Sequence, residues 1–252
     1  MGDGTVRTEW HEYREGWKHV KAEVIEEALI KIHVNGAELA TIMATPHELD
    51  CFALGFLKNE GLIEAYEDVD HIHQSENNCV DVWLTHTIPK PERAILTSGC
   101  GRGITFQDPS MALQPLEDDG HIRPEELSTL FKQLHFPGSL YARSRGVHTA
   151  GLSNGEEVLA IAEDVGRHNT IDKLLGKCML QNIETKGRIL LATGRVSSEM
   201  LIKGVLMECP IIASRNSATS MSVEMAQASN ITLIGYVKQN TMRVYTHPER
   251  LW

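Results

Sequence analysis

The sequence predicts an α/β protein with two domains, a small α+β domain over residues 1–121 and a larger α/β domain over residues 122–252. Three observations support this prediction. In the second half, strand-like and helix-like hydrophobic patterns alternate, which is typical of a mostly parallel sheet covered by helices. In the first half, two hairpin patterns flank one helical pattern. Around residues 97–123 both patterns break at glycine-rich and Asp-Asp-Gly stretches, so we place the domain boundary there.

The first domain begins with residues 1–23, which are polar and aromatic, and we expect them to form a loosely tied arm. The following segments, 28–34 and 38–44, flank Asn35 and Gly36. Because an Asn-Gly pair between two alternating segments is the strongest short hairpin signal, these segments are expected to pair as strands.

A helix and a second hairpin are expected next. Thr45-Pro46-His47-Glu48 has the spacing of a capping box with proline at the first helical position, which indicates a helix that should stop at Gly61. Segments 69–74 and 79–84 then have the pattern of two paired strands.

The second domain repeats strand and helix patterns without internal repeats or low-complexity segments. The expected strands are 147–152, 158–163, 188–193, 211–214, 232–237 and 242–245. The expected helices are 124–134, one that begins after Asp164 or Gly166, 197–207 and 221–228.

Composition limits the classes of function. The chain has 252 residues, which suffices for a substantial core. Its 24 Lys and Arg against 34 Asp and Glu give a net charge of −10, which argues against a general nucleic-acid binder but allows a local cationic pocket. No apolar run reaches the roughly 20 residues of a membrane span, and the first residues lack the apolar core of a signal peptide. We therefore expect a soluble cytoplasmic protein with no nucleic-acid or membrane partner.

One of the five cysteines stands in an unusual context. Cys51, Cys79, Cys178 and Cys209 lie in apolar or helical surroundings, and no two cysteines form the Cys-x-x-Cys of a zinc or redox site. Cys100 instead lies among three glycines and Arg102, where the sulfur would be exposed and Arg102 would favour the thiolate. This context fits a nucleophile or persulfide carrier, and it also fits a surface cysteine in a glycine-rich turn.

Three predicted strand ends carry an arginine together with Gly, Ser or Asn. These are segments 163–169 with Arg167 and His168, 193–199 with Arg195, and 214–219 with Arg215. Because helix N-termini at strand ends attract anions, the three together indicate a pocket for a phosphate- or nucleotide-bearing ligand, although each alone could be a solvated helix cap. The dinucleotide, Walker and zinc-deaminase motifs are missing from the sequence, so no metal ligands are assigned.

Five segments closely resemble the formate dehydrogenase accessory sulfurtransferase family, FdhD. They are 163–169 with Asp172 and Lys173, 97–101, 146–148, 194–197 and 244–251. The resemblance covers roughly residues 25–252. It implies that the larger domain has three layers and resembles the cytidine deaminase fold without its zinc site, and that the protein is a cytosolic homodimer.

The resemblance also implies a function. A family member takes persulfide sulfur from a cysteine desulfurase and passes it to the molybdenum cofactor, bis-molybdopterin guanine dinucleotide, before that cofactor enters formate dehydrogenase. Cys100 is then the persulfide cysteine, and Arg102 steadies its sulfur. The remaining residues implied in cofactor binding are Arg167, His168, Arg195, Arg215, Gly235, Tyr236, Val237, Lys238, Gln239 and Asn240.

One departure from the family pattern leaves alternatives open. Many members carry Cys-x-x-Cys in the loop of Cys100, whereas this chain has Gly103 at the second position. Either one cysteine suffices for carrying sulfur, or the protein is a cofactor-binding chaperone without sulfur transfer. A third alternative, a hydrolase acting on a nucleotide-like substrate, rests on fold analogy alone.

Overall fold

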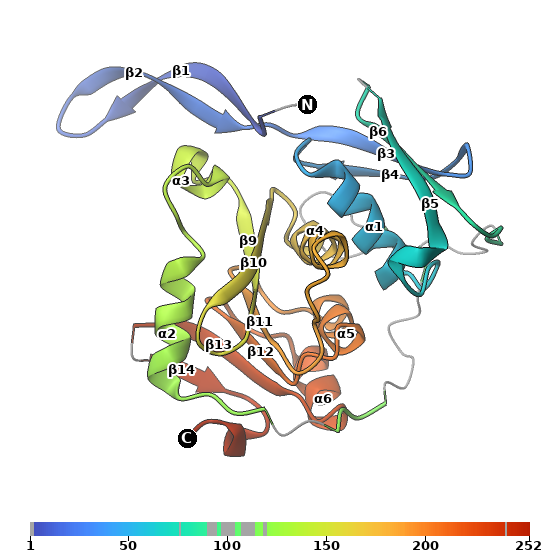
Figure 1. Ribbon diagram of the computed structural model, residues 1–252. Coiled ribbons are helices and arrows are strands. Elements are labelled where there is room, and N and C mark those ends of the chain that lie inside the picture. The colour runs from blue at the N-terminus through green and yellow to red at the C-terminus, as the bar shows by residue number, and fades with distance from the viewer. Residues whose placement is uncertain are drawn as a thin grey trace.

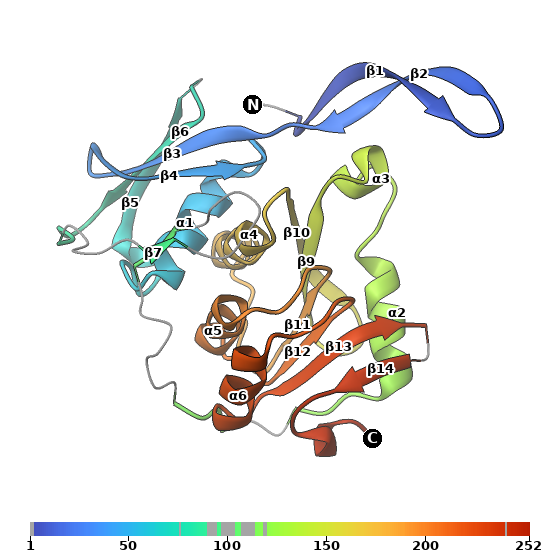
Figure 2. The same cartoon turned by 180° about the vertical axis from the view of Figure 1, so that it is seen from behind.

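A computed structural model describes residues 3–75, 77–89, 95–96, 104–106, 114–117, 120–239 and 241–252. It contains a six-stranded sheet, a four-stranded sheet and two two-stranded pairs among these residues. Figures 1 and 2 show the six-stranded sheet with helices on both sides of it and the N-terminal strands above. The mixed α/β fold class is confirmed. Within the described residues, no helix is both long and apolar enough to cross a membrane.

The N-terminal arm is a β-hairpin, so the expectation of a loosely tied arm is wrong. Strand β1 (Thr5–Tyr13) pairs antiparallel with β2 (Trp17–Ile25) over its whole length. Arg143 ties the base of this hairpin to the body, because its guanidinium forms ion pairs with Asp3 at 2.6 Å and Glu23 at 2.7 Å. The hairpin projects beyond the body in both views (Figures 1 and 2).

Both hairpins expected in the first domain are confirmed and join in one sheet. The order is β4 (Ala37–Ala44), β3 (Ala28–Val34), β6 (Cys79–Leu84) and β5 (Val69–Ser75), with β3 and β6 parallel. Asn35 and Gly36 have φ angles of 51° and 80°, as the two-residue turn between β3 and β4 requires. Helix α1 (Leu49–Asn59) packs its apolar side on this sheet, and a short 3-10 helix (Tyr66–Asp68) leads into β5.

The expected capping box before α1 does not form. The helix starts at Leu49 because Glu48 adopts a left-handed backbone (φ 53°) and gives no side-chain cap. The Thr45 hydroxyl instead accepts a hydrogen bond of 3.1 Å from the backbone N–H of Val165. A contact distant in sequence therefore replaces the local cap, which the spacing alone could not predict.

The six-stranded sheet is mixed and not mostly parallel. Its order is β10 (Val158–Asp164), β9 (His148–Ser153), β11 (Ile189–Ala192), β12 (Ile211–Ser214), β13 (Thr232–Lys238) and β14 (Thr241–Val244). Only β11–β12 and β12–β13 pair parallel in the described sheet. The reason is that short turns without a crossover helix join β9 to β10 and β13 to β14, and such turns force antiparallel pairing.

Helices cover both faces of this sheet, which gives three layers. One face packs against α4 (Arg167–Leu180), α5 (Ser198–Leu206) and α6 (Ser220–Ala228), and the other against α2 (Pro124–Gln133) (Figure 1). The short helix α3 (Leu140–Ser144) was not expected from the sequence, and a 3-10 turn (Pro248–Arg250) precedes the C-terminus. The similarity to the cytidine deaminase fold stays a prediction.

Helix α1 of the first half crosses α4 of the second half at two glycines. A Cβ on Gly55 would lie 1.8 Å from the Asp172 carbonyl oxygen, and one on Gly176 would lie 1.9 Å from the Cys51 carbonyl oxygen. Only glycine lets the two backbones approach this closely. The division at residue 121 stays a prediction, but the two halves share a close helix crossing.

Candidate functional site

The three arginine-bearing segments lie at one edge of the six-stranded sheet. Strands β11, β12 and β13 run parallel, so their carboxyl ends share this edge. Strand β9 runs the opposite way and starts there, and its His148 pairs with Asp164 at the end of β10. The predicted junctions 163–169, 193–199 and 214–219 therefore follow strand ends at one edge of the sheet, as expected.

Arg167 is the first residue of α4 and packs against the loop after β11. Its side chain is 9% exposed. A Cβ on Gly194 would lie 3.0 Å from Arg167 Cβ and 3.4 Å from His148 Nδ1, so the Arg167 and His148 side chains meet at the bare backbone of Gly194. The N-cap is Gly166, which offers no side-chain cap to the helix. A guanidinium beside a helix N-terminus is an arrangement that favours anions.

Asp164 and Lys173 form the support of this junction. Lys173 Nζ lies 2.7 Å from Asp164 Oδ2, and both side chains are fully buried. Asp164 Oδ1 accepts hydrogen bonds from the backbone N–H of Gly166 at 2.7 Å and from the Asn169 amide at 2.9 Å. Because a buried ion pair needs such additional hydrogen bonds, the turn before α4 is held in one geometry. Asp164, Asn169 and Lys173 thus hold the turn, and Arg167 lies at the site.

His168 lies next to Arg167 but is not a second cation. Its Nε2 lies 3.1 Å from Ser197 Oγ and 3.3 Å from the Glu199 carboxylate. A proton on Nε2 would face the Glu199 carboxylate favourably, because a carboxylate only accepts hydrogen bonds. Burial, followed by the charges of Lys203, Arg167 and His148, lowers the pKa of His168 to about 3 despite the nearby carboxylate. The expectation that His168 adds positive charge is therefore wrong, and the ring is a neutral hydrogen-bonding group.

His148 is a site residue that the sequence analysis did not assign. It is partly buried, and burial together with the charge of Arg167 lowers its pKa. The signal that could have found it is its place in the segment 146–148, which resembles the family; in the structure it is the first residue of β9, opposite Asp164. Arg167 is thus flanked by two imidazoles that are neutral near pH 7.

The other two arginines have surroundings that differ from those of Arg167. Arg195 follows Gly194 and is exposed. Arg215 donates a hydrogen bond of 3.1 Å to the Phe131 carbonyl of α2, and its guanidinium lies 5.5 Å from the centre of the Phe131 ring. Since α2 covers the face of the sheet opposite α4, these contacts draw Arg215 toward the other layer.

The segment expected to contact the dinucleotide is an irregular turn at the same sheet edge. The β13–β14 register shifts after Gly235, and Tyr236 has a positive φ of 54°. A Cβ on Gly235 would lie 2.8 Å from the Asn216 carbonyl, which accepts a hydrogen bond from Tyr236 N–H at 3.1 Å. The guanidinium of Arg243 lies 4.2 Å over the Tyr236 ring. Strand bulges of this kind redirect side chains at functional edges.

The remaining residues of this segment differ in the solvent exposure of their side chains. Val237 is 1% exposed and packs in the core against α2, so its side chain is not available to a ligand. Lys238 and Gln239 are exposed, and Gln239 has a positive φ of 46°. Asn240 lies outside the described residues.

Cys100 and Arg102 also lie outside the described residues, whereas the other four cysteines are described. Burial raises the pKa of both Cys51 and Cys178 to about 12. Cys209 is buried as well, and Cys79 is partly exposed. Cys51 and Cys178 are therefore protonated thiols in the core, which agrees with their apolar sequence context.

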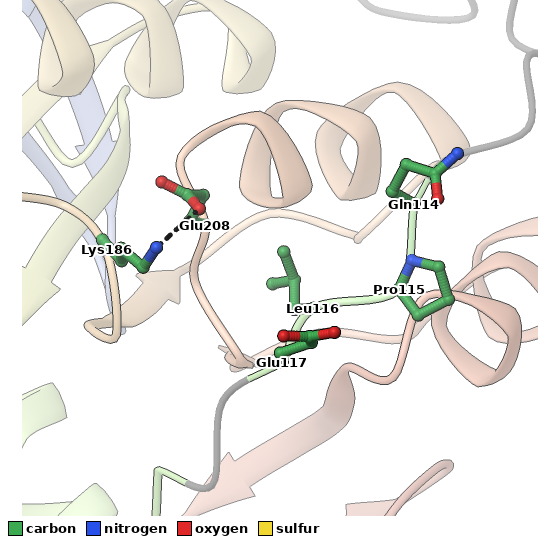
Figure 3. A pocket seen from close by; sticks show the side chains of 6 residues that line it. All are labelled: Gln114, Pro115, Leu116, Glu117, Lys186 and Glu208. Atoms are coloured by element: carbon green, nitrogen blue, oxygen red, sulfur yellow. Dashed lines mark ion pairs between the residues drawn. The ribbon is translucent and has the colours of Figure 1, made fainter.

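Figure 3 shows a pocket that lies elsewhere. It has a volume of about 310 Å³ and is lined by residues 114–117 together with Lys186 and Glu208, which form an ion pair at 3.3 Å. These two residues precede β11 and β12, so the pocket lies at the amino ends of the parallel strands. It is thus at the edge opposite Arg167. No group of three metal-ligating side chains occurs in the described part of the chain.

Comparisons with known proteins place the chain in a family. The family model described as FdhD/NarQ matches residues 25–252. "Sulfur carrier protein FdhD" of Bacillus subtilis is 30% identical over 253 residues, covering 98% of this chain and 97% of the relative. The protein of the same name from Wolinella succinogenes is 34% identical over 235 residues, covering 90% and 82%.

A solved structure agrees with this assignment. The crystal structure of a formate dehydrogenase accessory protein from Desulfotalea psychrophila is similar with a TM-score of 0.81 and 26% identity. The similarity covers 98% of this chain and 99% of that chain, so it includes both sheets and the crossing between them. The chain therefore belongs to the FdhD/NarQ family.

Proposed function

We propose that this protein is a sulfur carrier that serves a formate dehydrogenase. In this proposal it receives persulfide sulfur from a cysteine desulfurase on Cys100 and hands it to bis-molybdopterin guanine dinucleotide before that cofactor enters the dehydrogenase. Relatives named as sulfur carrier proteins and a similar formate dehydrogenase accessory protein support the carrier role. The observation that carries the proposal is the buried Arg167 at the uncapped N-terminus of α4, beside Gly194.

Sulfur uptake is a thiol exchange at Cys100. The Cys100 thiolate attacks the terminal sulfur of the desulfurase persulfide, the S–S bond of the donor breaks, and the desulfurase cysteine leaves as a thiolate. The product is a persulfide on Cys100, and no external oxidant or reductant is needed. The raised pKa values of Cys51 and Cys178 make them poor competitors for this step.

The nucleotide part of the cofactor would bind at the sheet edge. The guanidinium of Arg167 and the N–H groups at the N-terminus of α4 can hold phosphate oxygens, and a planar guanidinium suits two of them at once. Exposed Arg195 and Lys238 add positive charge at neighbouring strand ends. His148 and His168, being neutral, can donate hydrogen bonds without adding charge.

The alternative is a chaperone that binds the cofactor without carrying sulfur, and the single cysteine of the 97–103 segment favours it. The discriminating variant is Cys100→Ala, assayed for formate dehydrogenase activation in cells that lack their own accessory protein. Sulfur transfer predicts activation below about 1% of wild type, with Cys79→Ala as a control that stays active. Normal activation by Cys100→Ala would refute the transfer role and leave the chaperone.

A homodimer in the cytoplasm is part of the same proposal. It rests on the family resemblance and is tested by light scattering during gel filtration. A dimer would have twice the monomer mass of 28.1 kDa.

A further inference from the structure

Two short strands hold the ends of the segment that contains Cys100. Strand β7 (Ile95–Leu96) pairs antiparallel with β8 (Ile104–Thr105), and Leu96 lies opposite Ile104. Seven residues connect this pair in the sequence, with Cys100 in the middle. Four residues of chain reach at most about 14 Å, so the place of the β7–β8 pair limits where the Cys100 thiol can act.

Glu60 at the end of α1 fixes this pair to the body of the protein. Its Oε2 accepts a hydrogen bond of 3.0 Å from the Thr105 hydroxyl and one of 2.7 Å from the backbone N–H of Phe106. The Phe106 ring packs edge-on against Phe56 of α1, with ring centres 6.0 Å apart. Because two strands of two residues each cannot hold together alone, these contacts decide where the pair lies.

The carboxyl group of Glu60 is buried, which is unusual for a residue with a purely structural role. Glu60 is 7% exposed, and burial raises its pKa, opposed by the charge of Lys203 and the two hydrogen bonds. A buried carboxyl group is destabilising unless its hydrogen bonds are satisfied. Its two bonds go to Thr105, the last residue of β8, and to Phe106, which follows it, so the carboxyl serves that attachment.

Contacts of Asn59 and Lys203 with Asp172 of α4 connect the attachment point of the β7–β8 pair to the candidate site. Lys203 of α5 forms a buried ion pair with Asp172 at 2.6 Å, and Asn59 donates to Asp172 at 2.7 Å. The charge of Lys203 influences the pKa of Glu60 and also that of His168. Asp172 follows Arg167 by five residues in α4, so the attachment point of the β7–β8 pair lies within about two helical turns of the Arg167 site.

We propose that Glu60 is a positioning residue that holds the β7–β8 pair so that the Cys100 persulfide reaches cofactor bound at the Arg167 edge. Glu60 acts through Thr105 and Phe106 and does not touch the sulfur or the cofactor. This inference rests on the proposed sulfur-carrier function. Loss of Glu60 should impair delivery of sulfur to the cofactor and leave uptake of sulfur on Cys100 intact.

The test compares two substitutions with different hydrogen-bonding capacity. Glu60→Gln keeps a carbonyl oxygen that can accept from Thr105 and Phe106, whereas Glu60→Ala removes it. Each variant is loaded with a cysteine desulfurase and cysteine, the Cys100 persulfide is measured by intact mass, and formate dehydrogenase activation is measured in cells. We expect both variants to load like wild type, Glu60→Ala to lose at least tenfold in activation, and Glu60→Gln to stay within threefold.

Two further variants control for loss of folding. Asn59→Ala removes an adjacent buried side chain that donates to Asp172, so it reports general damage at this end of α1. Thr105→Val removes one of the two bonds to Glu60 while keeping the side-chain shape, and should lose activation by an intermediate amount. Thr105→Val decides the question if Glu60→Ala does not fold, because full activation by it would then overturn the inference.

The remaining outcomes are also decisive. Activation by Glu60→Ala within twofold of wild type, equal losses in Glu60→Gln and Glu60→Ala, or an equal loss in Asn59→Ala would each overturn the positioning role. Failure of Glu60→Ala to load sulfur would place Glu60 in uptake and overturn it as well. Failure of the wild-type protein to load would instead refute the proposed function itself.

Discussion

Arg167 is the residue on which the proposed binding of nucleotide phosphates depends most. Its guanidinium is nearly buried at the first turn of α4, so its charge is screened less by water than that of exposed Arg195. The sequence predicted this position from the strand-to-helix junction. It could not predict that Arg215, in a similar junction, turns instead to the Phe131 carbonyl, because that choice depends on the helix packed on the other face.

Arg167→Ala should weaken the binding of guanosine diphosphate by about 10- to 100-fold, since charge-assisted hydrogen bonds of this kind contribute roughly 1.5–3 kcal/mol. Arg195→Ala is the exposed control and should weaken binding less than about fivefold. Isothermal titration calorimetry measures both affinities. Unchanged affinity in Arg167→Ala would show that the nucleotide does not bind at this edge of the sheet.

His168 gives the protein a specific sensitivity to acid. The unfolded imidazole takes up a proton near pH 6.5, whereas the folded one does so only near pH 3. The unfolded state therefore binds more protons between these values, and stability falls as the pH falls through this window. Between pH 7 and pH 5 the loss from this group is about 2 kcal/mol.

His168→Gln should remove this loss, because glutamine does not titrate and its amide can still donate to Glu199 or Ser197. Urea unfolding at pH 7 and pH 5 measures the free energy of unfolding of both proteins. An equal drop in wild type and variant would show that other groups cause the acid sensitivity.

The crossing of α1 and α4 is the most constrained contact between elements. The sequence predicted both helices from their apolar periodicity, but it gave no sign that Gly55 and Gly176 face each other. It placed the start of α1 too early for a similar reason, because Thr45 is used by Val165 at a distance of 120 residues in sequence. Local patterns identify elements well, and contacts between distant segments then adjust their ends.

Gly55→Ala should destabilise the protein by more than about 3 kcal/mol, since the added Cβ would meet the backbone of Asp172, which cannot move without shifting α4. Gly204→Ala in α5 is the matched control. Its Cβ would meet the Cδ1 methyl group of Ile212, a side chain that can rotate, so a smaller loss is expected. Thermal unfolding compares the two, and equal stabilities would contradict the close crossing.

At the scale of the whole molecule, the sequence predicted an α/β architecture, the two hairpins of the first half and the shared edge of the strand ends. It overestimated the parallel share of the large sheet, because alternation of patterns does not reveal that β9 and β10 or β13 and β14 are joined by short turns. It also missed the N-terminal hairpin, whose base is held by Arg143 through contacts 120 and 140 residues apart in sequence.

Sulfur carriage on Cys100 underlies every later step toward the Arg167 edge, and intact-protein mass spectrometry detects it directly. Wild type and Cys100→Ala are incubated with a cysteine desulfurase and free cysteine. We expect a gain of one sulfur atom, about 32 Da, in wild type and none in Cys100→Ala. No gain in wild type, or an equal gain in the variant, would show that Cys100 is not the sulfur carrier.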